Sequence, residues 1–275
     1  MNPQYYQAQE ALQNSDYSQS LKELLYQLAD DDFLLAYRGS EWLGLAPHIE
    51  EDVAFSSISQ DTMGHAVLFY EMLEELGEGK ADDLAQLRSS EEFRNAILLE
   101  RPNGPGDYIK NPSYDWSFCF IRTYFYELYK LVRLQSLESC SYQPLAFAAT
   151  KIQNELLYHL YHWQVWMRQL LDGGAESRER ILQAIERVWV DSGDLIHYGN
   201  WEKEFLNYEL IEPADVLADR WKVKIQEVLV EPRLVTLAPI PEPKRSGRRG
   251  EHTEDLKKAL AILSEVYRLD PAASW

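Results

Sequence analysis

Four stretches of about 25 residues, each with apolar residues recurring every three or four positions, constrain the fold of this chain most strongly. Clusters of Pro, Gly and Asn separate them, and these breakers are otherwise sparse, with 13 Gly and 12 Pro in 275 residues. The best strand-like stretch is VLVEPRLVTL, at 228–237. The spacing therefore predicts an all-α protein, and four helices of this length are typical of a four-helix bundle.

The breakers also set the expected boundaries. A capping-box pattern of Ser20 and Glu23 predicts the start of the first long helix, and Gly77 is expected to cap the second. We expect a single domain, 1–275, with a core bundle over about 20–172 and accessory helices and a basic linker over about 175–275. The expected long helices are 20–46, 49–76, 114–139 and 144–172, and the expected shorter ones are 89–99, 177–190, 213–230 and 253–269.

Charge, cysteine content and the length of the apolar runs argue against several classes of protein. Lys and Arg number 27 against 45 Asp and Glu, which gives a net charge of −18 and argues against nucleic-acid binding. Two cysteines cannot build a disulfide framework. The N-terminal stretch has no basic region followed by an apolar one, and no apolar run approaches the ~20 residues of a membrane span. We therefore expect a cytoplasmic protein that is neither secreted nor membrane-bound.

Two of the six histidines occupy matching positions on different predicted helices. Asp61 precedes His65 by four residues, and Glu155 precedes His159 by four. Residues four apart share a helix face, so both pairs are expected to point into the bundle.

Di-metal centres in bundles use a related pattern, Glu-x-x-His on two helices and one Glu from each of the other two. The other two helices offer Asp32 and Glu127, but the position three before each histidine holds Thr62 or Leu156. Neither residue supplies an anionic oxygen, so two negative charges that a cation pair needs are missing. The sequence predicts a degenerate centre, with no metal-ligating, catalytic or cofactor-binding residue in this chain.

A centre without metal still has to balance its carboxylates, because an unpaired buried charge is costly. In di-iron bundles the carboxylate outside the ligand set typically bonds the histidine of the opposite helix. We therefore expect crossed pairs, Asp61 with His159 and Glu155 with His65, and raised pKa values for both histidines. On this hypothesis His65→Ala costs ~3–5 kcal/mol, because it strands a buried carboxylate.

Four basic residues stand out in this acidic chain, within LAPIPEPKRSGRRG at 237–250: Lys244, Arg245, Arg248 and Arg249. One interpretation is a mobile basic linker. The other is contact with an acidic partner surface or with the phosphates of a coenzyme A substrate. The stretch has no apolar periodicity, so replacing the four residues is expected to cost little stability.

Three segments together resemble the ferritin-like subunits of the bacterial phenylacetyl-CoA ring-epoxidase complex: Asp30-Asp31-Asp32, SQDTMGHAVLFYEMLEELG (59–77) and KIQNELLYHLYHW (151–163). In the catalytic subunit of that family the motifs read Asp-Glu-Leu-Gly-His and Glu-Glu-x-x-His. Thr62 and Leu156 replace the metal-binding Glu of each, which is typical of the family's non-catalytic C-subunit. The tail SGRRGEHTEDLKKALAILSEVYRLDPAASW (246–275) is also similar to the ending of that subunit.

The resemblance implies a ferritin-like four-helix bundle with additional C-terminal helices. It implies a structural role in a phenylacetyl-CoA epoxidase (monooxygenase) complex of phenylacetate catabolism, beside a homologous di-iron catalytic subunit. This chain would carry no cofactor and no activity of its own. A reductase subunit would deliver electrons from NADPH, and the acyl-CoA substrate would bind near the shared interface.

Two alternatives belong to other classes. One is an active ferritin-like oxidase or oxygenase with an atypical iron site, and the other is a stand-alone all-α interaction protein. The metal content of the purified chain separates the first alternative from the structural subunit, and co-purification with a homologous ferritin-like chain separates the second.

Overall fold

The computed structural model describes residues 4–106, 108, 110–230 and 238–273. Within these ranges the chain is helix and loop, and its one extended pairing is an isolated bridge between Tyr5 and Tyr142. The predicted all-α class is therefore confirmed. The strand-like stretch 228–237 is helical to Val230, and the rest of it lies outside the described residues.

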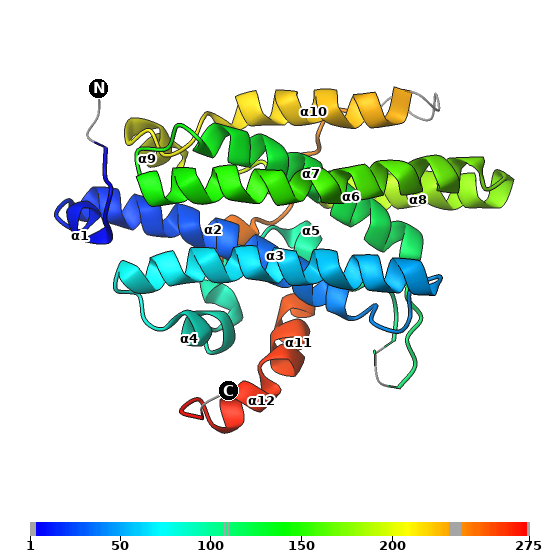
Figure 1. Cartoon of the computed structure of the whole chain (residues 1–275), viewed down its shortest axis with the longest axis horizontal. Helices are drawn as coiled ribbons and strands as arrows, with labels where there is room; N and C mark the ends of the chain where they lie inside the picture. The colour runs from blue at the N-terminus through cyan, green and yellow to red at the C-terminus, as the bar shows by residue number, and fades with distance from the viewer. Residues whose placement is uncertain (1–3, 107, 109, 231–237, 274–275) are drawn as a thin grey trace.

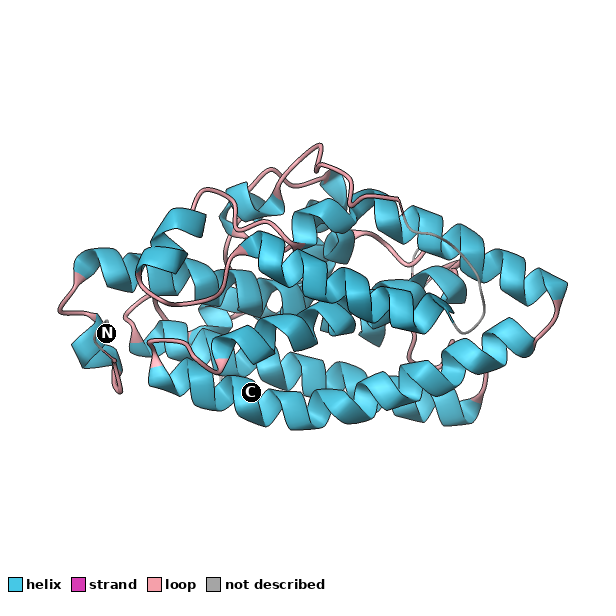
Figure 2. Ribbon diagram, turned by 90° about the horizontal axis from the view of Figure 1, so that it is seen from above, coloured by secondary structure: helices cyan, strands magenta, loops and turns pink. Residues whose placement is uncertain are grey.

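Four long helices form the core of the molecule: α2 (Ser15–Ser40), α3 (Ile49–Glu75), α6 (Trp116–Leu137) and α7 (Gln143–Asp172). α2 packs on α3, α6 packs on α7, and α3 also touches α7. Figure 1 shows α3 and α7 crossing the near face of the molecule, and Figure 2 shows the helices from above, most of them running lengthwise. The expected four-helix bundle is confirmed.

The first long helix begins earlier than the capping-box pattern predicts. Asn14 is the N-cap, and its side chain accepts a hydrogen bond from the backbone N–H of Tyr17 at 3.1 Å. Ser20 lies inside the helix and donates to the carbonyl of Asp16. The Ser20–Glu23 prediction is wrong because buried residues such as Tyr17 extend the apolar face of the helix toward its N-terminus.

The first long helix also ends earlier than predicted, at Ser40 and not at about 46, because residues 41–45 form turns before Pro47. The boundaries of the other three long helices lie within two residues of the prediction. Gly77 follows α3 with a φ of 84°, as a glycine after a helix end should. The capping box of Ser89 and Glu92 exists, but it opens only the 3₁₀ turn η1, and α5 is separate from it. Ser264 interrupts the expected last helix, which is α11 followed by α12.

Shorter elements surround the bundle, and α8 and α10 both pack on α6. They are α1 (Ala8–Ala11), α4 (Ala81–Gln86), η1 (Ser90–Glu92), α5 (Ile97–Glu100), α8 (Ala175–Asp191), η2 (Ser192–Leu195), α9 (Glu202–Asn207), α10 (Ala214–Val230), η3 (Gly247–Arg249), α11 (Glu254–Leu263) and α12 (Glu265–Leu269).

α6 runs through the middle of the molecule. Every one of its residues from Phe118 to Leu134 is buried, because α7, α8 and α10 pack around it and charged side chains tie it to α2. The buried set includes Glu127, Lys130 and Arg133, and charges in such a place need partners. The interior of this bundle is therefore partly ionic, and α6 supplies much of that charge.

The basic segment is not a free linker, because Arg248 is fully buried. Its guanidinium donates to both carboxylate oxygens of Asp31 at 2.8 Å, and Arg133 donates to the same carboxylate at 2.7 Å. The expectation that this residue matters little for folding is wrong, since a loop can bury an arginine without any apolar periodicity.

The other three basic residues of the segment, Lys244, Arg245 and Arg249, are exposed. Arg249 pairs with Glu251 at 3.1 Å, and Arg245 donates to the carbonyl of His252 at 3.2 Å. Within the described residues, no helix combines the length and apolar character that crossing a membrane requires.

Candidate functional site

Three consecutive aspartates on α2 organise the charged interior. Successive residues of an α-helix point about 100° apart, so Asp30, Asp31 and Asp32 face three directions, and all three are buried. Only Asp32 faces the centre between the four long helices. Each aspartate has cationic partners from another part of the chain: Arg88 for Asp30, Arg133 and Arg248 for Asp31, and Lys130 for Asp32.

Lys130 of α6 lies at the centre of the bundle and is only 5% exposed. Its Nζ is 2.7 Å from Oδ2 of Asp32 and 2.9 Å from Nδ1 of His65. The other oxygen of Asp32 accepts a hydrogen bond from the hydroxyl of Tyr126 at 2.7 Å. The lysine ammonium thus joins α2 and α3 through α6.

The contact with Lys130 determines the protonation of His65. A lysine ammonium only donates, so Nδ1 of His65 accepts, and Nε2 carries the ring proton. That nitrogen lies 2.8 Å from Oε2 of Glu155 and donates to it. Burial and the neighbouring charges of Lys130 and His159 lower the pKa of His65 far below its usual range. The expected rise in this pKa is wrong, because the sequence reasoning did not include the lysine.

His159 has the opposite environment, since carboxylates face both of its ring nitrogens. Nδ1 is 3.0 Å from Oε1 of Glu127, and Nε2 is 3.2 Å from Oδ2 of Asp61. Although burial favours the neutral ring, hydrogen bonds and charge from Glu127, followed by the bond to Asp61, raise the pKa of His159. The other oxygen of Glu127, Oε2, accepts a hydrogen bond from the indole N–H of Trp163 at 2.6 Å.

The crossed pairs expected from the sequence are present in the structure, Asp61 with His159 and Glu155 with His65. The pairs also show that α3 and α7 run in opposite directions. The two outer carboxylates are not buried: the side chain of Asp61 is 49% exposed and that of Glu155 is 41% exposed. The network therefore extends from the centre to the surface of α3 and α7.

The residues present do not fit a di-iron centre of the kind that the catalytic relatives would carry. Thr62 turns its hydroxyl to the carbonyl of Ile58 at 2.8 Å, and Leu156 is a fully buried hydrocarbon. Both oxygens of Asp32 and of Glu127 already have donors. In the part of the chain that the structure describes, no group of three or more His, Cys, Asp or Glu is arranged to hold a metal ion.

Sequence reasoning missed three members of this centre: Tyr126, Lys130 and Trp163. A signal for Lys130 existed, because it follows Glu127 by three residues and so shares its helix face. His162 lies outside the centre, with Nε2 3.0 Å from Glu51 and its ring against Trp163.

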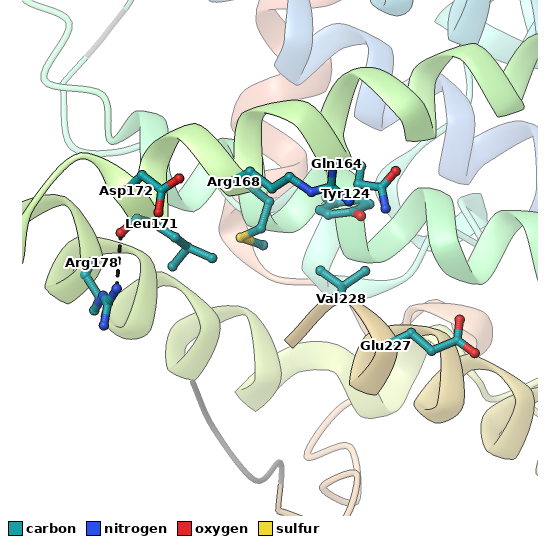
Figure 3. Close-up of a pocket in the computed structure, with 9 residues that line it drawn as sticks. Tyr124, Gln164, Arg168, Leu171, Asp172, Arg178, Glu227 and Val228 are labelled. Atoms are coloured by element: carbon teal, nitrogen blue, oxygen red, sulfur yellow. Dashed lines mark hydrogen bonds between the residues drawn. The ribbon is translucent and has the colours of Figure 1, made fainter. Parts of the chain in front are cut away.

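A second feature is an open groove of about 580 Å³ between α7, α8 and α10, drawn in Figure 3. Tyr124 of α6 forms its floor, Gln164 and Arg168 come from α7, and Glu227 and Val228 come from α10. None of the residues that line it belongs to the central network, so it is separate from the degenerate centre.

The fold and the centre define a class: four-helix bundles of ferritin type whose centre is filled by paired, charged protein side chains. A family model described as "Phenylacetic acid catabolic protein" matches residues 4–275, and the chain belongs to that family. It is 27% identical over 252 residues to the C-subunit of the 1,2-phenylacetyl-CoA epoxidase of Escherichia coli (strain K12), covering 90% of this chain and 96% of that relative. The resemblance based on the sequence motifs is confirmed.

Proposed function

We propose that this chain is a non-catalytic, structural subunit of the multicomponent monooxygenase that epoxidises the aromatic ring of phenylacetyl-CoA. In this role it supports the homologous di-iron catalytic subunit in the cytoplasm, while a reductase subunit supplies electrons from NADPH. The likeness to a relative named as an epoxidase subunit supports membership of such a complex. The observation that carries the non-catalytic part is the centre itself, where Lys130 stands between Asp32 and His65.

The surface that we assign to the di-iron subunit is the outer face of α3 and α7, which Figure 1 shows toward the viewer. Tyr158 is 79% exposed and Phe147, on the same helix, is 68% exposed; exposed apolar side chains that gather in a patch mark interaction sites. An obligate interface buries upwards of ~2,000 Å², and two long adjacent helices offer a surface on that scale. Other exposed apolar residues of the two helices are Ile49, Val53 and Val67, whereas Leu157 and Tyr161 line a hollow beside α10.

Gly64 also favours the outer face of α3 and α7 as the surface that a partner covers. It lies in the middle of α3, is exposed, and a Cβ atom built on it meets nothing within 4 Å. A glycine inside a helix costs about 1 kcal/mol relative to alanine, so a reason other than folding is needed for it. Close approach of a partner helix is such a reason, since the missing side chain leaves room at the level of His65.

The experiment is co-expression of the tagged chain with its di-iron homologue, followed by size-exclusion chromatography. We expect one stable complex at micromolar concentration. Gly64→Trp and Tyr158→Asp should abolish it without lowering the thermal midpoint, because both side chains point away from the core. Val223→Asp is the matched control, since Val223 is 53% exposed on α10, at the edge of the molecule opposite α3 in Figure 1.

Two results would contradict the proposal. One is a chain that stays monomeric in the presence of the di-iron homologue, which would favour a stand-alone interaction protein. The other is near-stoichiometric iron in the purified chain with oxidase activity, which would favour the atypical metalloenzyme. If Val223→Asp disrupts the complex and Tyr158→Asp does not, the interface lies on another face of the molecule.

A further inference from the structure

We propose that the ammonium of Lys130 is the resident cation of this centre and that it excludes transition metals, so that its removal opens a metal site at Asp32 and His65. The proposal concerns the chemistry of the centre and goes beyond the subunit role. It stands on the contacts around one side chain.

The first step is the position of the ammonium. Lys130 holds Oδ2 of Asp32 at 2.7 Å and Nδ1 of His65 at 2.9 Å, and these are an oxygen and a nitrogen of the kind that iron, cobalt and zinc bind. A cation that binds both atoms must take the place of Nζ. The lysine side chain is 6% exposed, so the ammonium lies within the helix packing and not at the surface.

The second step is the availability of lone pairs. A histidine ligates a metal through a nitrogen that carries no proton. His65 gives the lone pair of Nδ1 to Lys130 and keeps a proton on Nε2, which donates to Glu155. His159 donates from both nitrogens, to Glu127 and to Asp61. Neither histidine therefore offers a lone pair while these contacts persist.

The third step compares Lys130 with the two lost carboxylates. Thr62 and Leu156 reduce the charge that a metal pair needs, while Asp32, Glu127 and two histidines remain as donor groups; in the described part of the chain, with their present partners, they are not arranged to hold a metal ion. Between Asp32 and His65, the ammonium of Lys130 already supplies the positive charge that a single ion would bring. Restoring a carboxylate at position 156 would, with the lysine in place, give the ammonium another partner and not a metal.

The experiment is a two-by-two set of full-length chains: wild type, Lys130→Ala, Leu156→Glu and the double variant. Each is purified metal-free and titrated with Co²⁺, followed by the visible absorption of the ion and by calorimetry. We expect no binding by wild type or Leu156→Glu, one Co²⁺ per chain for Lys130→Ala, and at least about tenfold tighter binding for the double variant. Lys130→Arg is the control that keeps a cation, and it should take no metal.

Stoichiometric Co²⁺ binding by wild type or by Leu156→Glu would overturn the proposal, as would the absence of binding in folded Lys130→Ala and double variants. Circular dichroism reports folding, and Lys130→Gln serves if the alanine variant does not fold. Co-purification with the di-iron homologue remains a separate readout. A failure of metal exclusion and a failure of the subunit role are therefore distinguishable.

Discussion

Arg248 donates to both carboxylate oxygens of Asp31, 217 residues earlier in the chain, at 2.8 Å. The segment that carries it comes very close to the bundle, because a Cβ atom on Gly247 would lie 1.9 Å from the carbonyl oxygen of Asn95. His252 also ties this segment to α5, because its Nδ1 lies 2.7 Å from Oε2 of Glu100. The C-terminal basic motif is therefore a clasp that closes over α2 and α5.

Because Arg248 closes the clasp, its substitution should lower the stability of the protein much more than substitution of its exposed neighbour. Arg248→Ala leaves Asp31 with Arg133 and the backbone N–H of Ala96 and opens a cavity, and breaking a buried ion pair typically costs about 3–5 kcal/mol. We expect the free energy of unfolding, measured with urea, to fall by about 3 kcal/mol. Arg249→Ala is the matched control, and because Arg249 is exposed beside Glu251 it should change stability by less than ~1 kcal/mol. Equal effects of the two substitutions would contradict the clasp.

The two central histidines should differ in their cost to stability. His159→Ala removes the charged partner of Glu127, which is buried and keeps only the indole N–H of Trp163, so we expect a loss of ~3–5 kcal/mol. His65→Ala frees Glu155, whose side chain is 41% exposed and can be hydrated, so a loss of ~1–3 kcal/mol is expected from the cavity and the lost hydrogen bonds. Urea unfolding of both variants measures the order. The sequence-based value of ~3–5 kcal/mol for His65→Ala assumed a buried Glu155 and needs this correction.

Much of this fold follows from helical periodicity alone. The long helices α3, α6 and α7 begin and end within a few residues of the positions where Pro, Gly and Asn interrupt the apolar spacing. The crossed pairs of Asp61 with His159 and of Glu155 with His65 were also predictable. The four-residue spacing places a carboxylate and a histidine on one face of each helix, and in di-iron bundles such an outer carboxylate bonds the histidine of the opposite helix.

Lys130 and Arg248 were not predictable in the same way. Lysine and arginine are seldom fully buried, so a sequence pattern alone assigns them to the surface. Lys130 is buried because Asp32 of α2 and His65 of α3 cover the side of α6 that carries it, and the sequence of α6 does not reveal these neighbours. The place of Arg248 depends on a loop that returns to α2 from the far end of the chain, and no local periodicity encodes such a contact.

The pH dependence of stability should have opposite signs at the two histidines. The folded pKa of His159 lies above the unfolded value of about 6.5, so its contribution is full below that pH and is lost as pH rises through the folded pKa. The folded pKa of His65 lies below the unfolded value, so the unfolded chain alone takes up a proton as pH falls below about 6.5, and stability decreases there.

Urea unfolding between pH 5 and 9 separates these two contributions, each with a slope of at most about 1.4 kcal/mol per pH unit. His65→Asn should flatten the loss of stability on the acid side, and His159→Asn should flatten the loss on the alkaline side. If both variants changed the same side of the profile, the assignment of a neutral His65 and a charged His159 would be wrong.

The exposed part of the basic segment should act in assembly or acyl-CoA binding and not in folding. Lys244, Arg245 and Arg249 are exposed on an acidic chain, so an acidic partner surface or coenzyme A phosphates can reach them. Replacing all three by Gln, with Arg248 kept, should leave the thermal midpoint nearly unchanged and weaken binding to the di-iron subunit or to phenylacetyl-CoA. The difference from wild type should shrink at high salt, where such contacts are already screened. Calorimetry at low and high salt measures both affinities, and equal affinities at low salt would exclude a role for these three residues.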